Sequence, residues 1–375
     1  MANNIPSSTA DAQSTIVSRL RFPLILLVVY VHSFGIPAED TNVPLLHSGF
    51  YEMVRTLLSG MIAHSAVPTF FFISGFLMFY RVEGYSLQLY RTKMRNRFFS
   101  LLIPYIIWNL IALGVWFVRQ IDMGLAADEV VSHYMEKGFF SCFWIFYMIG
   151  GASVDWFGNV SHLTAPVDLP LWFLRDLIVV SICSPVVYFV IRRGRGWALS
   201  FLAVLFLSGL FQNCPGLSSC CAFFYSFGAW FSITKRDFAT FFHRFFQPAL
   251  WLYVLLLGIM VWRHGTEAAS MLFPLLRLIG MFVFLGFAEW GVRHTSSSLP
   301  PVFAEGSFFV FAVHYVIFLS FVDQLVGKVF PTTHEVTHAL QYLVAPLIKT
   351  CLYIAVYYLL KRWMPLVTSV LIGKR

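Results

Sequence analysis

Long apolar runs, separated by short clusters of charged and polar residues, make up most of this chain. Ten of these runs are close to the length of about 20 residues with which a helix crosses the hydrocarbon core of a bilayer. They cover residues 20–37, 62–81, 98–118, 171–191, 197–212, 217–233, 247–263, 271–290, 303–323 and 339–361. We therefore predict an all-α fold, a polytopic membrane bundle of about ten transmembrane helices.

The composition agrees with a membrane protein and excludes a large soluble domain. Hydrophobic residues make up 58% of the 375 residues and charged residues 12%, whereas about 25% of the residues in ordinary soluble domains are charged. A soluble core of this length could not cover so much apolar surface. The excess must therefore face lipid.

The formal net charge of +8 is explained by topology, because the basic residues lie between the apolar runs. With a cytoplasmic N-terminus, 18 of the 26 Lys and Arg residues lie in the inner segments or at the inner ends of the ten runs, and five lie on the outer side. Cytoplasmic loops are rich in Lys and Arg. We therefore expect no nucleic-acid partner, and predict a location in the plasma (inner) membrane with both termini cytoplasmic.

The chain shows one tail and one long connection. Residues 1–18 are polar and rich in Ser and Thr, which predicts a disordered cytoplasmic tail. We expect residues 19–375 to form a single transmembrane domain with a long outer connection at about 119–170, whose aromatic content favours an ordered cap. Within it, the short apolar stretch 138–150 is typical of a re-entrant or interfacial helix.

Arg21 and His32 are the most informative polar residues in the first apolar run. Eleven residues apart on one helix, they differ by about 20° in phase and lie about 16 Å apart along the axis. One helix face would then carry a cation at the cytoplasmic mouth and an imidazole deep in the bilayer. A substrate with an anionic head and a long neutral arm fits this pattern, and His32 could act as general base. Alternatively, His32 only hydrogen-bonds a neighbouring helix.

Four cations, Arg91, Lys93, Arg95 and Arg97, lie within seven residues just before the third apolar run. Such a cluster can bind phosphate groups. It can equally anchor the chain at the cytoplasmic surface, next to anionic lipid.

Further polar groups occur at or within later runs. Trp172, Arg175 and Asp176 lie at the outer end of the fourth run. Because adjacent residues do not face each other on a helix, we expect Arg175 and Asp176 to pair with other helices and to line an outward chamber or support the structure. His314, expected inside the ninth helix, could meet His32 or bond a backbone carbonyl.

Ser74 and Gly75 lie together in the second run. Ser74 lacks the surroundings of a nucleophilic serine, so we expect the Ser-Gly pair to allow close contact between helices.

Together these segments resemble the bacterial acyltransferase-3 family, whose members are membrane O-acyltransferases of cell-surface glycans. The family pattern of Arg, ten residues and His matches Arg21 and His32, and the stretches PTFFFISGFLMFY (68–80), RNRFFSLLIPYIIWN (95–109), LWFLRDL (171–177) and FFVFAVHY (308–315) match further blocks in the family's order. The family's Arg-x-x-Arg element has no strict match among the basic residues of 91–97.

The resemblance implies transfer of an acyl group, usually acetyl, from cytoplasmic acyl-CoA to a hydroxyl of a glycan or lipid-linked sugar. It implies His32 as the catalytic histidine and Arg21 as its partner in the motif. Acetyl-CoA would be a donor substrate rather than a bound cofactor, and no metal is expected because no cluster has ligand spacing. A flippase for a lipid-linked sugar and a membrane scaffold remain as alternatives.

Overall fold

A computed structural model describes residues 9–33, 45–154, 160–209, 214–295 and 299–373 of the chain. The chain divides into two compact units. Unit 1 comprises Met1–Ile73, Lys235–Phe311 and Leu319–Val356, and unit 2 comprises Ser74–Thr234, Ala312–Phe318 and Tyr357–Arg375.

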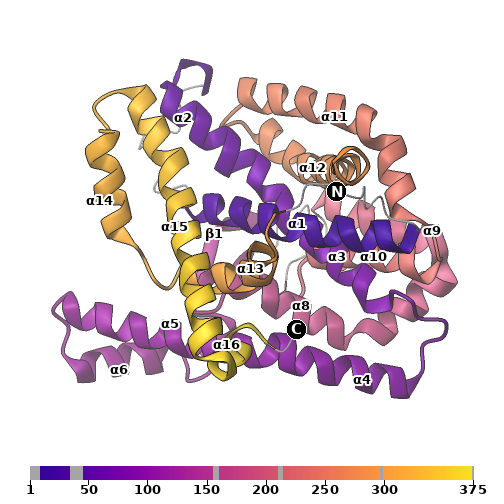
Figure 1. Cartoon of the computed structure of the whole chain (residues 1–375), viewed down its shortest axis with the longest axis horizontal. Coiled ribbons are helices and arrows are strands. Elements are labelled where there is room, and N and C mark those ends of the chain that lie inside the picture. The colour runs from indigo at the N-terminus through magenta and orange to yellow at the C-terminus, as the bar shows by residue number, and fades with distance from the viewer. Residues whose placement is uncertain (1–8, 34–44, 155–159, 210–213, 296–298, 374–375) are drawn as a thin grey trace. The chain divides into compact units, whose positions relative to one another are not determined.

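Helices form nearly all of unit 1 (Figure 1). They are α1 (Thr9–His32), α2 (Phe50–Arg55), the π-helix η2 (Thr56–Met61), the 3₁₀ helix η3 (Ile62–Ser65), the start of α3 (Ala66–Phe79), α11 (Phe238–Trp262), α12 (Glu267–His294), α13 (Pro301–Val313), α14 (Ser320–Val329) and most of α15 (Glu335–Trp363). The 3₁₀ helix η1 (Leu45–His47) precedes α2.

Unit 2 combines helices with one small sheet. Its helices are α4 (Leu87–Arg97), the π-helix η4 (Phe98–Leu102), α5 (Ile103–Asp122), α6 (Ala127–Glu136), α7 (Ser141–Trp144), the 3₁₀ helix η5 (Leu169–Leu171), α8 (Trp172–Ile182), α9 (Ser184–Ser208), α10 (Ser219–Ile233) and α16 (Pro365–Ile372).

The protein has several helices that can span a membrane, but the predicted ten are not confirmed. Six helices in the described part of the chain are long and apolar enough, and α8 with α9 adds a seventh if this pair, bent by 66°, is one span. The predicted runs 171–191 and 197–212 fall on this pair, with non-helical backbone at Arg195 inside α9. α10 and α13 are shorter apolar helices. Hydropathy shows how long each apolar run is. It does not show whether a bend joins two runs into one span or separates them.

The first helix begins earlier than expected. α1 starts at Thr9, so the part of the predicted tail between residues 9 and 18 is helical. Burial explains the difference, because the side chains of Ile16 and Val17 are buried. In addition, the Gln13 amide donates a hydrogen bond to Asp237 Oδ1 at 2.8 Å. Residues 1–8, and residues 34–37 of the predicted run, lie outside the described residues.

The stretch 138–150 was predicted as a helix and instead contributes to a sheet. Only the short α7 is helical there, and it is followed by strand β1 (Tyr147–Val154), which pairs with β2 (Val160–Ala165) in antiparallel register, Tyr147 opposite Ala165. A short apolar run rich in aromatic and β-branched residues fits either structure, so periodicity could not decide.

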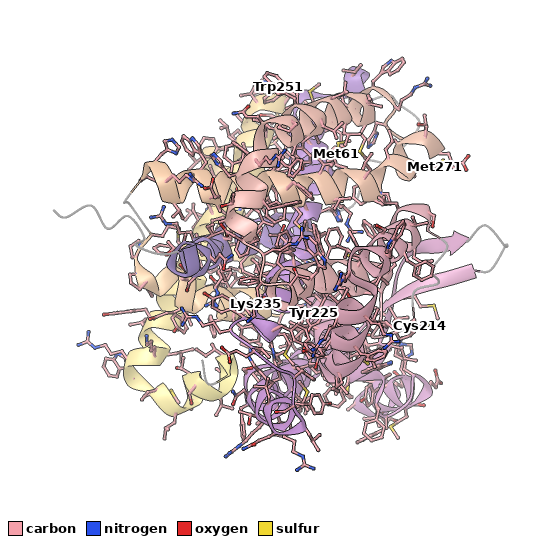
Figure 2. The ribbon with its side chains drawn as sticks, turned by 90° about the vertical axis from the view of Figure 1, so that its right-hand side faces the viewer. Met61, Cys214, Tyr225, Lys235, Trp251 and Met271 are labelled. Carbon is pink, nitrogen blue, oxygen red and sulfur yellow. The ribbon has the colours of Figure 1, made fainter. Side chains whose placement is uncertain are left out.

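Helices α11 and α12 lie side by side in unit 1 (Figure 1). Met61 of η2 is buried in a hydrophobic cluster with Tyr253 of α11 and Leu276 of α12. Figure 2 shows Trp251 and Met271 pointing away from these helices, and both are exposed. Exposed large apolar side chains on such helices are expected where lipid is the solvent.

In unit 2, close helix contact occurs at Gly75, as predicted. A Cβ at this position would overlap the backbone carbonyl of Tyr225 in α10, so only glycine allows this approach. At the other end of the unit, α16 packs on α5, where Trp108 Nε1 donates to the Leu371 carbonyl at 2.9 Å.

Candidate functional site

Arg21 and His32 lie on one uninterrupted helix, α1, in unit 1. The predicted separation of about 16 Å along the axis therefore applies to a real helix. His32 is the last residue of this helix and of the candidate span Ala12–His32, rather than a residue in its interior as the predicted run implied. Its imidazole is therefore carried at a helix end, where backbone carbonyls are left without intrahelical donors.

The last turn of α1 is held by side chains from two other helices of unit 1. The buried Ser59 hydroxyl donates to the Tyr30 carbonyl at 2.5 Å and shares a further hydrogen bond with the Tyr342 hydroxyl. The Tyr30 hydroxyl donates to the Leu343 carbonyl at 2.6 Å. These bonds satisfy a terminal carbonyl two residues before His32 and fix the position of the turn that carries the imidazole.

The backbone around Ser59 is irregular, which explains how a serine reaches α1. Ser59 lies in the π-helix η2, which is followed by the 3₁₀ helix η3, all within the candidate span Phe50–Phe79. π-helical turns are rare and occur frequently at functional sites. The pattern of apolar residues gave no sign of this break.

If the acyl transfer implied by the family resemblance depends on His32, Ser59→Ala should lower its kcat roughly tenfold through misplacement of the His32 turn. The KM for acyl-CoA should stay unchanged, since Ser59 is assigned no contact with the donor. Tyr342→Phe should have a similar effect on kcat. The double variant Ser59→Ala/Tyr342→Phe should lower kcat by less than the product of the two single effects, because both residues act through one contact.

Steady-state kinetics of the purified variants, with thermal unfolding measured in parallel, test this expectation. Ser307→Ala is the matched control, because it removes another buried serine hydroxyl of unit 1, one that bonds within its own helix. A fully active Ser59→Ala protein, or a loss equal to that of Ser307→Ala, would refute the positioning role.

A second polar group, at the start of the candidate span Phe50–Phe79, was not predicted from the sequence. Arg55 is 2% exposed and forms two hydrogen bonds to the Glu52 carboxylate, at 2.9 and 2.6 Å. Tyr51 precedes Glu52 in the chain, and its ring stacks on His338 of α15, with ring centroids 3.4 Å apart. The spacing of Glu52 and Arg55, three residues apart, was the available signal, but the predicted run began only at residue 62.

Near the middle of α1, polar contacts tie this helix to the end of α12. Arg19 donates to the Gly291 and Thr295 carbonyls at 2.9 and 3.0 Å, and so satisfies the C-terminal end of α12. Glu289 of α12 is buried and pairs with His243 and Arg293. Arg21 lies two residues further along α1 and is partly buried.

The four cations before the third run lie on α4 in unit 2, and the helix divides them. Arg91 and Arg95 are exposed, whereas Lys93 and Arg97 are partly buried and close enough for their charges to interact. Arg97 also interacts electrostatically with the buried Tyr225. The group is therefore two pairs on different helix faces rather than one continuous patch.

Arg175 and Asp176 bond to each other, which was not predicted, and each also has a partner at another helix, as predicted: Arg175 at α7 and Asp176 at Ser218, the N-cap of α10. The Arg175 Nε and Nη2 groups donate to Asp176 Oδ1 at 3.2 and 3.1 Å, and both side chains are buried. Nη1 donates to the Trp144 carbonyl at 2.5 Å and to Thr164 Oγ1 at 3.1 Å. Adjacent residues on a solvent-exposed helix point in different directions and seldom pair. Here both side chains are buried, and the Arg175 guanidinium bonds to the nearest carboxylate.

These contacts fasten α8 to α7 and β2, which gives Arg175 a structural role. Trp172 is the first residue of α8 and is partly buried. His314 was expected inside a helix, but α13 ends at Val313, and the buried His314 lies in the turn that follows. His314 belongs to unit 2 and His32 to unit 1, so a meeting of the two stays a prediction. Among the described residues, no three His, Cys, Asp or Glu side chains gather to hold a metal ion.

Comparison with known proteins assigns the chain to a family. The model of the acyltransferase-3 family, described as an acyltransferase domain, matches residues 17–360. The chain is also 24% identical over 373 residues to the succinoglycan biosynthesis protein ExoH of Rhizobium meliloti, with 96% of this chain and 92% of the relative covered. No solved structure matches the chain significantly. This multi-pass membrane protein belongs to the acyltransferase-3 family.

Proposed function

We propose that this protein moves an acyl group, in the first place acetyl, from cytoplasmic acyl-CoA to a hydroxyl of a cell-surface glycan or lipid-linked sugar. The family match over residues 17–360 supports acyl transfer. The similarity to a protein named for succinoglycan biosynthesis supports a glycan as acceptor. The proposed location is the plasma (inner) membrane with both termini cytoplasmic, as the distribution of Lys and Arg favours.

The observation that carries the proposal is the helix α1, which holds Arg21 and, at its end, His32. In the proposed reaction, His32 takes the proton of the acceptor hydroxyl as its oxygen attacks the thioester carbonyl carbon. The carbon–sulfur bond then breaks, and the CoA thiolate receives the proton from the imidazolium. A route through an acyl-imidazole would use the same residue as nucleophile.

The donor's phosphates need cations, and two sets are proposed. Arg21 follows from the family pattern, and the α4 residues Arg91, Lys93, Arg95 and Arg97 supply the charge-assisted hydrogen bonds that phosphates prefer. Trp172, Arg175, Asp176 and His314 are proposed to shape or support the acceptor side.

Release of free CoA thiol tests the proposed function. Purified protein in nanodiscs would be given acetyl-CoA, with and without a de-esterified extract of surface glycans. We expect thiol release that depends on the extract. If acetyl-CoA and longer acyl-CoAs give no release while a labelled lipid-linked sugar crosses the bilayer, the protein is a flippase and the proposal is wrong.

A further inference from the structure

The Asp168 carboxyl group is unusual within unit 2. Its side chain is fully buried, and neither oxygen has a hydrogen-bond partner in the part of the chain that the structure describes. The backbone around it is fixed, because the amide donates to Asn109 Oδ1 at 3.1 Å and the carbonyl accepts from the Leu171 amide at 2.9 Å. The residue is therefore held in place with its two acceptor oxygens unused.

Three further polar side chains of unit 2 gather with this carboxyl. Tyr147 begins β1, Tyr315 lies in the turn after α13, and Arg119 lies in the last turn of α5. Both phenols interact electrostatically with Asp168 and with Arg119. Arg119 Nη2 also donates to the Val316 carbonyl at 3.4 Å, which ties the turn to α5. We call these four residues, Asp168, Tyr147, Tyr315 and Arg119, the Asp168 cluster.

Burial disfavours the ionised forms of the carboxyl and phenol groups in this cluster. Burial raises the pKa of Asp168 well above its usual range. Burial, with the Tyr315 phenol second, raises the pKa of Tyr147 to about 12. The two phenols are therefore O–H groups that can both donate and accept, and they lie beside a carboxyl group whose charged form is disfavoured by burial. Exposure decreases from Arg119 through the partly exposed Tyr147 and Tyr315 to Asp168, so a ligand would meet the phenols before the carboxyl.

An unsatisfied buried polar group lowers the stability of the folded state, so its retention calls for an explanation. A polyhydroxyl ligand offers one, because its hydroxyls can donate hydrogen bonds to the two carboxyl oxygens that lack partners. Aromatic side chains lie beside the cluster: Val167 and Val316, next to Asp168 and Tyr315 in the chain, pack with the buried Phe146 and with Trp116 and Tyr147, which are partly exposed. Such rings can cover the apolar faces of a sugar. A metal cation fits less well, since the positive Arg119 acts on the same phenols.

We propose that the Asp168 cluster binds hydroxyl groups of the sugar acceptor, with Asp168 as the deepest contact. This inference rests on the proposed acyl transfer for its role, although sugar binding itself can be measured without any acyl donor.

Two variants test the proposal, Asp168→Leu and Tyr147→Phe. The first replaces the two carboxyl oxygens with methyl groups on the same branched frame, and the second removes only a phenol hydroxyl. Asp128→Asn is the control, because Asp128 is exposed on α6 of the same unit. The probe is a set of oligosaccharides released from the surface polysaccharide of the source organism and freed of esters by mild alkali.

The first readout is thermal unfolding with the oligosaccharides and without acyl-CoA. We expect the oligosaccharides to raise the Tm of the wild type and of Asp128→Asn, as a ligand of the folded state must, but not the Tm of Asp168→Leu. Without sugar, Asp168→Leu should unfold at the same temperature as the wild type or higher, because an unsatisfied buried group is gone. The second readout is the transfer reaction, in which both variants should raise the KM for acceptor about tenfold or more and leave the KM for acyl-CoA unchanged.

The outcomes separate this inference from the proposed function. If the wild type releases CoA but its Tm does not respond to the oligosaccharides, or if Asp168→Leu keeps the response, the sugar-binding inference is wrong and acyl transfer stands. If the Tm response is present and lost in Asp168→Leu while no acyl-CoA is consumed, the cluster binds sugar and the proposed function falls.

Discussion

The variant His32→Ala should lose acyl transfer while remaining folded. A positioned general base accelerates proton transfer by about 10²- to 10⁴-fold, and a nucleophilic histidine would be lost altogether. His32 is the last residue of α1, so truncation to Ala removes the imidazole without disturbing a helix interior. We therefore expect a kcat lower by at least about a hundredfold, measured as CoA thiol release in nanodiscs.

The control for this variant is His334→Ala, which removes an exposed histidine of the same unit. It should retain full activity. Both proteins must unfold at the temperature of the wild type. Near-normal turnover by a folded His32→Ala protein would show that the imidazole takes no part in the reaction, whatever the activity of the family.

Arg175→Ala should destabilise the protein more than any other substitution considered for unit 2. The change leaves the buried Asp176 carboxylate without its guanidinium and removes the donor to the Trp144 carbonyl and to Thr164. Breaking a buried ion pair on one side costs about 3–5 kcal/mol. Thermal or denaturant unfolding in detergent should show this loss, whereas Arg192→Ala, at an exposed position of α9, should change little.

The double variant Arg175→Ala/Asp176→Ala separates a buried ion pair from simple loss of packing. With no uncompensated charge left, it should be more stable than Arg175→Ala alone. If Arg175→Ala unfolds like the wild type, or if the double variant is the less stable of the two, the structural role assigned to Arg175 is incorrect.

The sequence predicted the class of fold well because membrane helices are dictated by the absence of water. Ten runs of apolar residues identified the places where helices occur, and helical periodicity put Arg21 and His32 on one helix. The Ser74–Gly75 pair predicted a close contact for a steric reason, and Gly75 does approach the Tyr225 backbone. These predictions depend on local chemistry alone.

Features that depend on tertiary contacts could not be predicted. The π-helix around Ser59 and the bend between α8 and α9 leave the hydropathy almost unchanged. The pairing of Arg175 with Asp176 depends on burial, which reverses the rule for neighbours on an exposed helix. Asp168 appeared as one acidic residue in an outer connection, and only the fold shows that its carboxyl is buried.

The most direct test of the central claim is to look for the transferred group on the acceptor itself. Proteoliposomes containing the wild type or His32→Ala would be incubated with isotope-labelled acetyl-CoA and de-esterified surface oligosaccharides, and the sugars analysed by mass spectrometry. We predict labelled acetyl esters, removable by mild alkali, with the wild type and not with His32→Ala. Unlabelled oligosaccharides after complete incubation with the folded wild-type protein, using acetyl and longer acyl donors, would contradict the claim that this protein is a glycan O-acyltransferase.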